Sequence, residues 1–244
     1  MKKINIIIMT VLCFVFIAPI TAQSKDETQV PQTNTSEQMC IMQEHMNISC
    51  NDSVYVQLIK KSITLAVLDM LITGYNKDGE PIYLSTCARQ FGGCEKHIRE
   101  LTNYFYEQYE LRGINPMIFF SIGFHETLFD SFAINENSGS SGVLQIMPYT
   151  NVGRDIRFIH DRKYRRECRN VIGGCQREIV EAGAGIIERS MRRCGGNMAK
   201  ALGMYGSGNC NGSRSFSRYV MRLAGELEAR QKLYMAHFLY DHEI

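Results

Sequence analysis

Residues 114–150 read INPMIFFSIGFHETLFDSFAINENSGSSGVLQIMPYT. Asn115 precedes Pro116, an order that is typical of a helix N-cap followed by the first helical residue. Apolar residues at helical spacing then predict a helix over about 116–129. The polar stretch 135–142, rich in glycine and serine, predicts a loop after that helix.

Glu126 lies near the C-terminal end of this predicted helix, among neighbours that are mostly apolar. Burial among such neighbours would raise the pKa of the carboxyl and keep it protonated near neutral pH. A protonated carboxylic acid is what a glycosidase needs to give a proton to a leaving oxygen. The alternative is that Glu126 points outward or caps a backbone group, because one carboxylate at a helix end is weak evidence by itself.

The remainder of the chain predicts a mostly α-helical fold with loops tied by disulfides, because alternating β patterns are nearly absent. Asn76 to Gly79 predicts a turn, and Gly113 ends a helix. The further helices are expected at residues 54–74, 95–112, 176–193, 197–205 and 214–238.

Nine cysteines occur, and all but Cys13 fall into local couples. The couples are Cys40 with Cys50, Cys87 with Cys94, Cys168 with Cys175, and Cys194 with Cys210. An even number of cysteines in an exported chain indicates disulfides. Pairing of nearest neighbours is one of 105 possible connectivities. Zinc is the rival interpretation, but C-x-x-C spacings and the matching histidine intervals are absent.

The chain begins with an export signal, in which two lysines precede an apolar run and Ala22 offers a cleavage site. We therefore predict a signal peptide over residues 1–22, with a retained membrane anchor as the alternative. Residues 23–37 are polar and predict a flexible linker. The chain without residues 1–22 has 25 basic and 25 acidic residues, and its net charge is therefore zero. This balance does not indicate the basic surface that nucleic-acid binding requires.

A strongly basic stretch spans residues 154–169, RDIRFIHDRKYRRECR. Such a run is typical of a solvated face. The alternative is a contact to an anionic polymer or partner, and the sequence does not choose between the two.

Three ordered segments resemble the soluble lytic transglycosylase family, whose fold is related to goose-type lysozyme. Residues 115–129 are similar to the entry to its catalytic helix and the glutamate that follows. Residues 139–150, GSSGVLQIMPYT, are similar to its glycine-rich segment, and residues 201–208, ALGMYGSG, to its Ala-Tyr-Asn-Ala-Gly segment. The resemblance covers roughly Ile114 to Leu223.

The resemblance implies a lysozyme-like α-helical domain that acts on peptidoglycan glycan strands without a cofactor or metal. It implies that Glu126 is catalytic and that the Tyr205 hydroxyl lies close to it and orients it. Gly139 and Gly142 would let the backbone approach a sugar, and Gln145 would offer amide groups to its substituents. The residues expected to bind substrate are Gln145, Tyr205, Leu144 and Ser141.

The implied reaction is a lytic transglycosylation of the β-1,4 bond between MurNAc and GlcNAc. Glu126 protonates the glycosidic oxygen, the substrate N-acetyl group stabilises the cation, and Glu126 then takes the proton of the C6 hydroxyl to close a 1,6-anhydro ring. Among several departures from the family pattern, the one at Gly206 matters most and the one at Thr127 is mild. Thr127 replaces a serine and keeps the hydroxyl, whereas Gly206 replaces an asparagine and puts a substrate contact, or activity itself, in doubt.

Three alternatives stay open. A lysozyme-like hydrolase would pair Glu126 with a second acid, for which Asp130, Glu136 and Asp155 are candidates. A peptidoglycan-binding scaffold could keep the fold without activity. A disulfide-rich interaction module would use residues 38–95 and the basic stretch.

We predict four parts of the chain: the signal peptide (1–22), the linker (23–37), a helical, cysteine-containing N-terminal extension (38–100) and the catalytic domain (101–244). The extension is expected to pack on the catalytic domain, because about 60 residues make only a marginal core. Signal cleavage leaves no membrane span and predicts a periplasmic protein, with secretion outside the cell as the alternative. By the family resemblance, a secretion or conjugation apparatus is a candidate partner.

Overall fold

The computed structural model describes residues 53–241. The predicted signal peptide, the linker and the Cys40–Cys50 pair lie outside these residues. All described residues belong to one unit, Ser49–Ile244.

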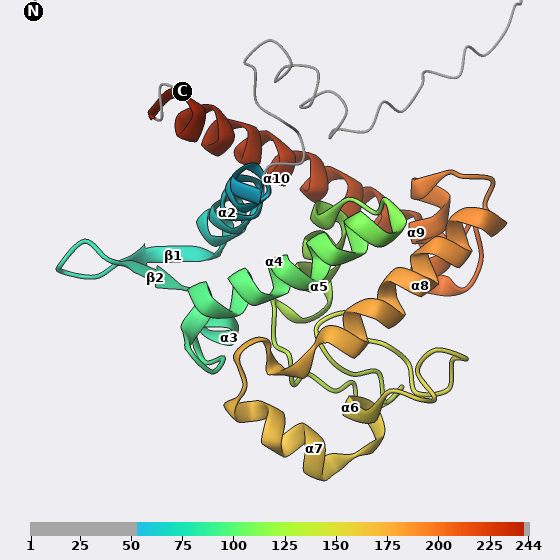
Figure 1. Cartoon of the computed structure of the whole chain (residues 1–244). Coiled ribbons are helices and arrows are strands. Elements are labelled where there is room, and N and C mark those ends of the chain that lie inside the picture. The colour runs from blue at the N-terminus through green and yellow to red at the C-terminus, as the bar shows by residue number, and fades with distance from the viewer. Residues whose placement is uncertain (1–52, 242–244) are drawn as a thin grey trace, which may run out of the picture. The chain divides into compact units, whose positions relative to one another are not determined.

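Helices dominate this unit, which confirms the predicted mostly α-helical class (Figure 1). The Asn115 side chain caps the helix that carries Glu126, by accepting a 2.9 Å hydrogen bond from the Met117 amide. The long helices are α2 (Ser53–Leu71), α4 (Gly93–Arg112), α5 (Pro116–Thr127), α8 (Arg177–Arg193), α9 (Met198–Ser207) and α10 (Arg214–Asp241). Short helical turns are α3 (Ser85–Ala88), α6 (Arg157–His160), α7 (Arg162–Glu167), η1 (Cys168–Asn170) and η2 (Ile172–Cys175).

A small antiparallel hairpin, β1 (Ile72–Tyr75) and β2 (Pro81–Tyr83), corrects the expectation that residues 54–74 are helical throughout. The helix ends at Leu71 because β-branched residues and then glycine follow it, and these are weak helix formers. The predicted turn is present: the Asn76 side chain accepts hydrogen bonds from the amides of Asp78 and Glu80.

Two helices organise the packing. Figure 1 shows α10 running beside α2, and α10 also contacts α5 and α9. α4 lies against α2, α5 and α8, and it crosses the predicted boundary at residue 100 as a continuous helix. The segment from residue 53 to 100 therefore contributes directly to the core that surrounds α5.

Aromatic side chains fill the centre of that core. The ring of Phe105 on α4 lies 5.2 Å from Phe119 and 4.7 Å from Phe120, and Phe120 lies 5.9 Å from Phe129. All four are fully buried, and burial of each such side chain contributes about 1.5–3 kcal/mol. This packing fixes α5, and with it the position of Glu126.

Three disulfides confirm nearest-neighbour pairing within the described residues: Cys87–Cys94, Cys168–Cys175 and Cys194–Cys210. Six of the cysteines considered as metal ligands are thereby paired with one another. Within residues 53–241, no helix combines the length and the apolar character that crossing a bilayer requires.

Candidate active site

Glu126 is the penultimate residue of α5, at the point where the helix leaves the core. Residues 116–123 of the helix are all buried, whereas the Glu126 side chain is 27% exposed. The buried N-terminal part anchors the helix, and its last turn carries the carboxyl to a partly open surface.

The helix ends in a turn with unusual backbone angles. Leu128 and Phe129 have positive φ values of 51° and 63°. The amide of Leu128 bonds to the Phe124 carbonyl at 3.2 Å, and that of Phe129 to the Gly123 carbonyl at 3.4 Å. Glycine is the usual residue in such a cap, and each residue held there at a positive φ costs about 1–3 kcal/mol. The complete burial of the Phe129 ring helps to offset that cost.

The pKa of Glu126 is raised above the ordinary value, which confirms the direction expected from its apolar neighbours. Burial is the main cause, because it disfavours the charged form. His125 acts in the opposite direction: its Nδ1 lies 3.6 Å from the Glu126 Oε1, and it lowers the pKa without cancelling the effect of burial. Glu126 therefore keeps its proton to a higher pH than an exposed glutamate.

His125 is held by two aromatic rings from α10. Its ring centroid lies 4.9 Å from that of Phe216 and 5.1 Å from that of Tyr219, and both pairs are edge-on. No local pattern in the sequence predicts this cluster. Only the position of His125 beside Glu126 could have indicated it, because the two rings come from a helix about 90 residues later in the chain.

Tyr205 on α9 lies near Glu126, and its hydroxyl binds the loop. The hydroxyl donates a 2.7 Å hydrogen bond to the Leu144 carbonyl. Burial raises the pKa of Tyr205, and the charge of Glu126 raises it further. The Tyr205 ring is parallel to that of Phe216, with centroids 6.1 Å apart. The fold thus brings Tyr205 and Glu126 into one electrostatic environment.

The other residues predicted to bind substrate lie within the loop that follows α5. Gln145 donates to the carbonyls of Ala133 (3.2 Å) and Gly142 (3.1 Å) and accepts from the Ser140 hydroxyl (2.8 Å). The side chains of Ser141 and Leu144 are buried. These groups hold the loop together, and direct substrate contacts at the three positions stay predictions.

Gln176 is a further buried support of this loop that sequence reasoning missed. Its side-chain oxygen accepts a 2.8 Å hydrogen bond from the Val143 amide, and its nitrogen donates to the carbonyls of Ser131 and Gly174. A Cβ atom on Gly142 would lie 2.7 Å from the Gln176 oxygen, and the φ of Gly142 is +78°. The positive φ and the close approach of Gln176 therefore require glycine at position 142, and an approach of this backbone to a sugar stays a prediction.

None of the candidate second acids is among the groups that shift the pKa of Glu126. Asp130 accepts hydrogen bonds from the Phe132 amide at 2.9 Å and from Gln90 at 3.4 Å. Glu136 and Asp155 are exposed. Across residues 53–241, His125 is the charged group that shifts the pKa of Glu126, and a second carboxylate does not contribute. Nor do the described residues include a cluster of three or more His, Cys, Asp and Glu that could hold a metal ion.

The basic stretch forms α6 and α7, and several of its arginines have structural contacts. Arg157 lies over the Tyr164 ring at 4.2 Å, and Arg169 lies over Phe132 at 4.9 Å. Arg165 donates to the carbonyls of two residues of α6. These arginines therefore stabilise the local structure around the basic stretch. A contact of the stretch to an anionic polymer stays a prediction.

Gly206 lies one residue after Tyr205 on the exposed side of α9. A Cβ atom there would lie 3.0 Å from the Ser213 Oγ and 3.1 Å from the Phe216 Cδ1. Ser213 itself has a φ of 38°. The space that an asparagine would need is therefore narrowed by the turn before α10.

The sequence model of the transglycosylase SLT domain matches residues 103–223, about half of the chain. No curated protein and no solved structure is significantly similar to this chain. The matched span contains Glu126, the loop 133–146 and Tyr205, which are the parts brought together above. SLT domains are the domains of peptidoglycan lytic transglycosylases. The chain thus belongs to the soluble lytic transglycosylase family, whose SLT domains act on peptidoglycan.

Proposed function

We propose that this protein cleaves the β-1,4 bond between MurNAc and GlcNAc in peptidoglycan and leaves a 1,6-anhydro end. Glu126 is the single acid and base in this proposal. The observation that carries it is a partly buried carboxyl with a raised pKa, at the end of α5, inside the matched SLT span.

In the first step the Glu126 carboxyl gives its proton to the glycosidic oxygen as the bond from that oxygen to C1 of the muramic sugar breaks. The N-acetyl group of the same sugar stabilises the positive charge at C1. The Glu126 carboxylate then takes the proton of the C6 hydroxyl while O6 bonds to C1. The acid form is restored, and water is not consumed.

A raised pKa supports both halves of this cycle. Burial keeps the carboxyl protonated at the start, and it makes the carboxylate a stronger base after the first proton transfer.

Mass analysis of muropeptides released from purified peptidoglycan tests the proposal. We expect anhydromuramic products from the wild type, and a loss of at least about 100-fold in release with Glu126→Gln. Reducing-end products, heavier by one water, would instead identify a hydrolase. Binding of peptidoglycan without release by the wild type would identify an inactive scaffold.

We also propose that the protein is periplasmic after cleavage of residues 1–22. Support comes from the signal pattern in the sequence and from the disulfides, which suit an oxidising compartment. N-terminal sequencing of the mature protein should begin at Gln23, and fractionation should recover it with periplasmic markers. We also propose a secretion or conjugation apparatus as a partner, and co-purification would test that association.

A further inference from the structure

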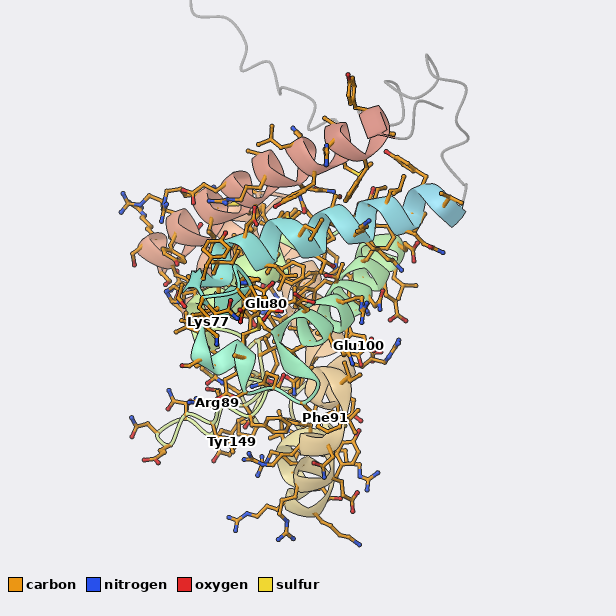
Figure 2. All side chains as sticks on the ribbon, turned by 90° about the vertical axis from the view of Figure 1, so that its left-hand side faces the viewer. Lys77, Glu80, Arg89, Phe91, Glu100 and Tyr149 are labelled. Carbon is orange, nitrogen blue, oxygen red and sulfur yellow. A yellow bond between two sulfur atoms is a disulfide. The ribbon has the colours of Figure 1, made fainter. Side chains whose placement is uncertain are left out.

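A segment outside the matched SLT span lies against the backbone that follows Glu126. It comprises residues 85–97, which we call the brace, and it includes α3 and the first turn of α4. The Cys87–Cys94 disulfide closes it, and Gly92 and Gly93 make its tight bend with φ values of +82° and +84°. Figure 2, which looks at the molecule from the left-hand side of Figure 1, labels Arg89 and Phe91 of this segment.

Three side chains of the brace reach three consecutive residues of the turn after α5. Thr86 donates a 2.8 Å hydrogen bond from its hydroxyl to the Leu128 carbonyl. The His97 Nε2 lies 3.2 Å from the Phe129 carbonyl. Gln90 donates a 3.4 Å hydrogen bond to the Asp130 carboxylate. The first two contacts fall on the two residues whose φ angles are positive.

His97 is suited to hold that carbonyl. It is fully buried on α4, and burial lowers its pKa to about 4, so the ring is neutral at ordinary pH. A neutral imidazole has one N–H group. Because a carbonyl can only accept, the hydrogen must be on Nε2, which leaves the buried Nδ1 without a partner in the described structure.

We propose that the brace positions the catalytic glutamate, with Thr86 and His97 as positioning residues that act through the turn at Leu128 and Phe129. The inference rests on the proposed role of Glu126. Two consecutive residues at positive φ do not hold that conformation by local preference. Loss of a hydrogen bond to either carbonyl would let the turn relax and move Glu126, two residues before it, relative to the substrate.

The hydroxyl of Thr86 gives the sharpest test, because Thr86→Val removes the donor and keeps the shape. On soluble glycan strands we expect kcat to fall about 10- to 100-fold, as for a small displacement of a reacting group, with KM within about twofold. Thr86→Ser keeps the donor and should restore most of kcat. Thr73→Val is the matched control, because Thr73 makes the same kind of bond, 3.0 Å to the Ile82 carbonyl, within the hairpin.

His97→Phe removes the second donor and is expected to lower kcat in the same way, with thermal melting recorded to identify a folding defect. If Glu126→Gln is inactive but Thr86→Val retains full kcat, the brace is wrong and the proposed function stands. An equal loss in Thr86→Val and Thr73→Val would also overturn it, because general destabilisation would then explain both. If the wild type releases no anhydro products, the proposed function fails first.

Discussion

The Tyr205 hydroxyl donates a 2.7 Å hydrogen bond to the Leu144 carbonyl, across 61 positions of sequence. This bond joins α9 to the loop after α5, and the charge of Glu126 is felt at the same hydroxyl. Tyr205 thus connects two segments of the matched SLT span beside the proposed acid.

Tyr205→Phe tests that connection. The ring remains beside Phe216 while the Leu144 carbonyl loses its partner, so we expect the free energy of unfolding to fall by about 1–2 kcal/mol. Turnover should fall as well, because the loop is no longer fixed against α9. Urea unfolding and muropeptide release measure the two effects. Tyr149→Phe, at an exposed tyrosine, is the control, and an equal change there would contradict a specific role.

His125→Gln should change the pH dependence of the reaction. His125 lowers the pKa of Glu126, so its removal raises that pKa further above the ordinary value. The acid form then persists to higher pH, and the alkaline limb of the pH–rate profile should move upward. His160→Gln, on α6, is the control and should leave the limb in place. A downward movement in His125→Gln would contradict the assignment of that limb to Glu126.

Glu126→Gln should alter stability in a way that depends on pH. Because the folded-state pKa of Glu126 is raised, the folded state holds the proton more tightly than the unfolded state. This favourable contribution is complete below the ordinary pKa of 4.5 and is lost as pH rises through the folded-state value. At pH 7 the variant should therefore have a higher melting temperature than the wild type, and the difference between the two melting temperatures should disappear near pH 4.

Glu188→Gln provides a control of opposite sign for that experiment. Partial burial raises the pKa of Glu188, but Arg192 and Arg112 outweigh it, and the resulting pKa is below the ordinary value. The wild type should therefore be at least as stable as Glu188→Gln at pH 7. If both variants are less stable than the wild type at pH 7, the charge of Glu126 is not penalised by burial.

Gly206→Asn restores the residue type expected by family resemblance, but the turn before α10 limits it. The new Cβ would press on the side chains of Ser213 and Phe216, so we expect the free energy of unfolding to fall by about 0.5–1.5 kcal/mol, the cost of displacing a side chain from its rotamer. Adding Ser213→Gly removes one clash and suits the positive φ at that position. The double variant should recover most of the loss, as measured by urea unfolding. If it remains as unstable as the single variant, the clash with Ser213 is not the cause.

Local signals predicted most of the helices and their ends. The apolar periodicity of 116–129, the Asn115 cap and Gly113 act over one or two turns, and the structure contains each of them. The hairpin at 72–83 was missed because Ile72 and Thr73 continue the apolar pattern of the preceding helix. Only a competing strand partner at 81–83 and the Asn76 turn draw the chain out of the helix.

Spacing and capping, which are short-range properties, predicted the helical class and the place of Glu126 at the end of an apolar helix. Nearest-neighbour pairing of the cysteines was one of 105 connectivities, and the structure contains three of those pairs. The tertiary structure alone decided what surrounds that carboxyl. His125 contacts Phe216 and Tyr219, and Gln176 and the brace hold the loop and the turn, through contacts between residues 32 to 94 positions apart. Such contacts depend on how helices pack against one another, and no local pattern in the chain specifies that packing.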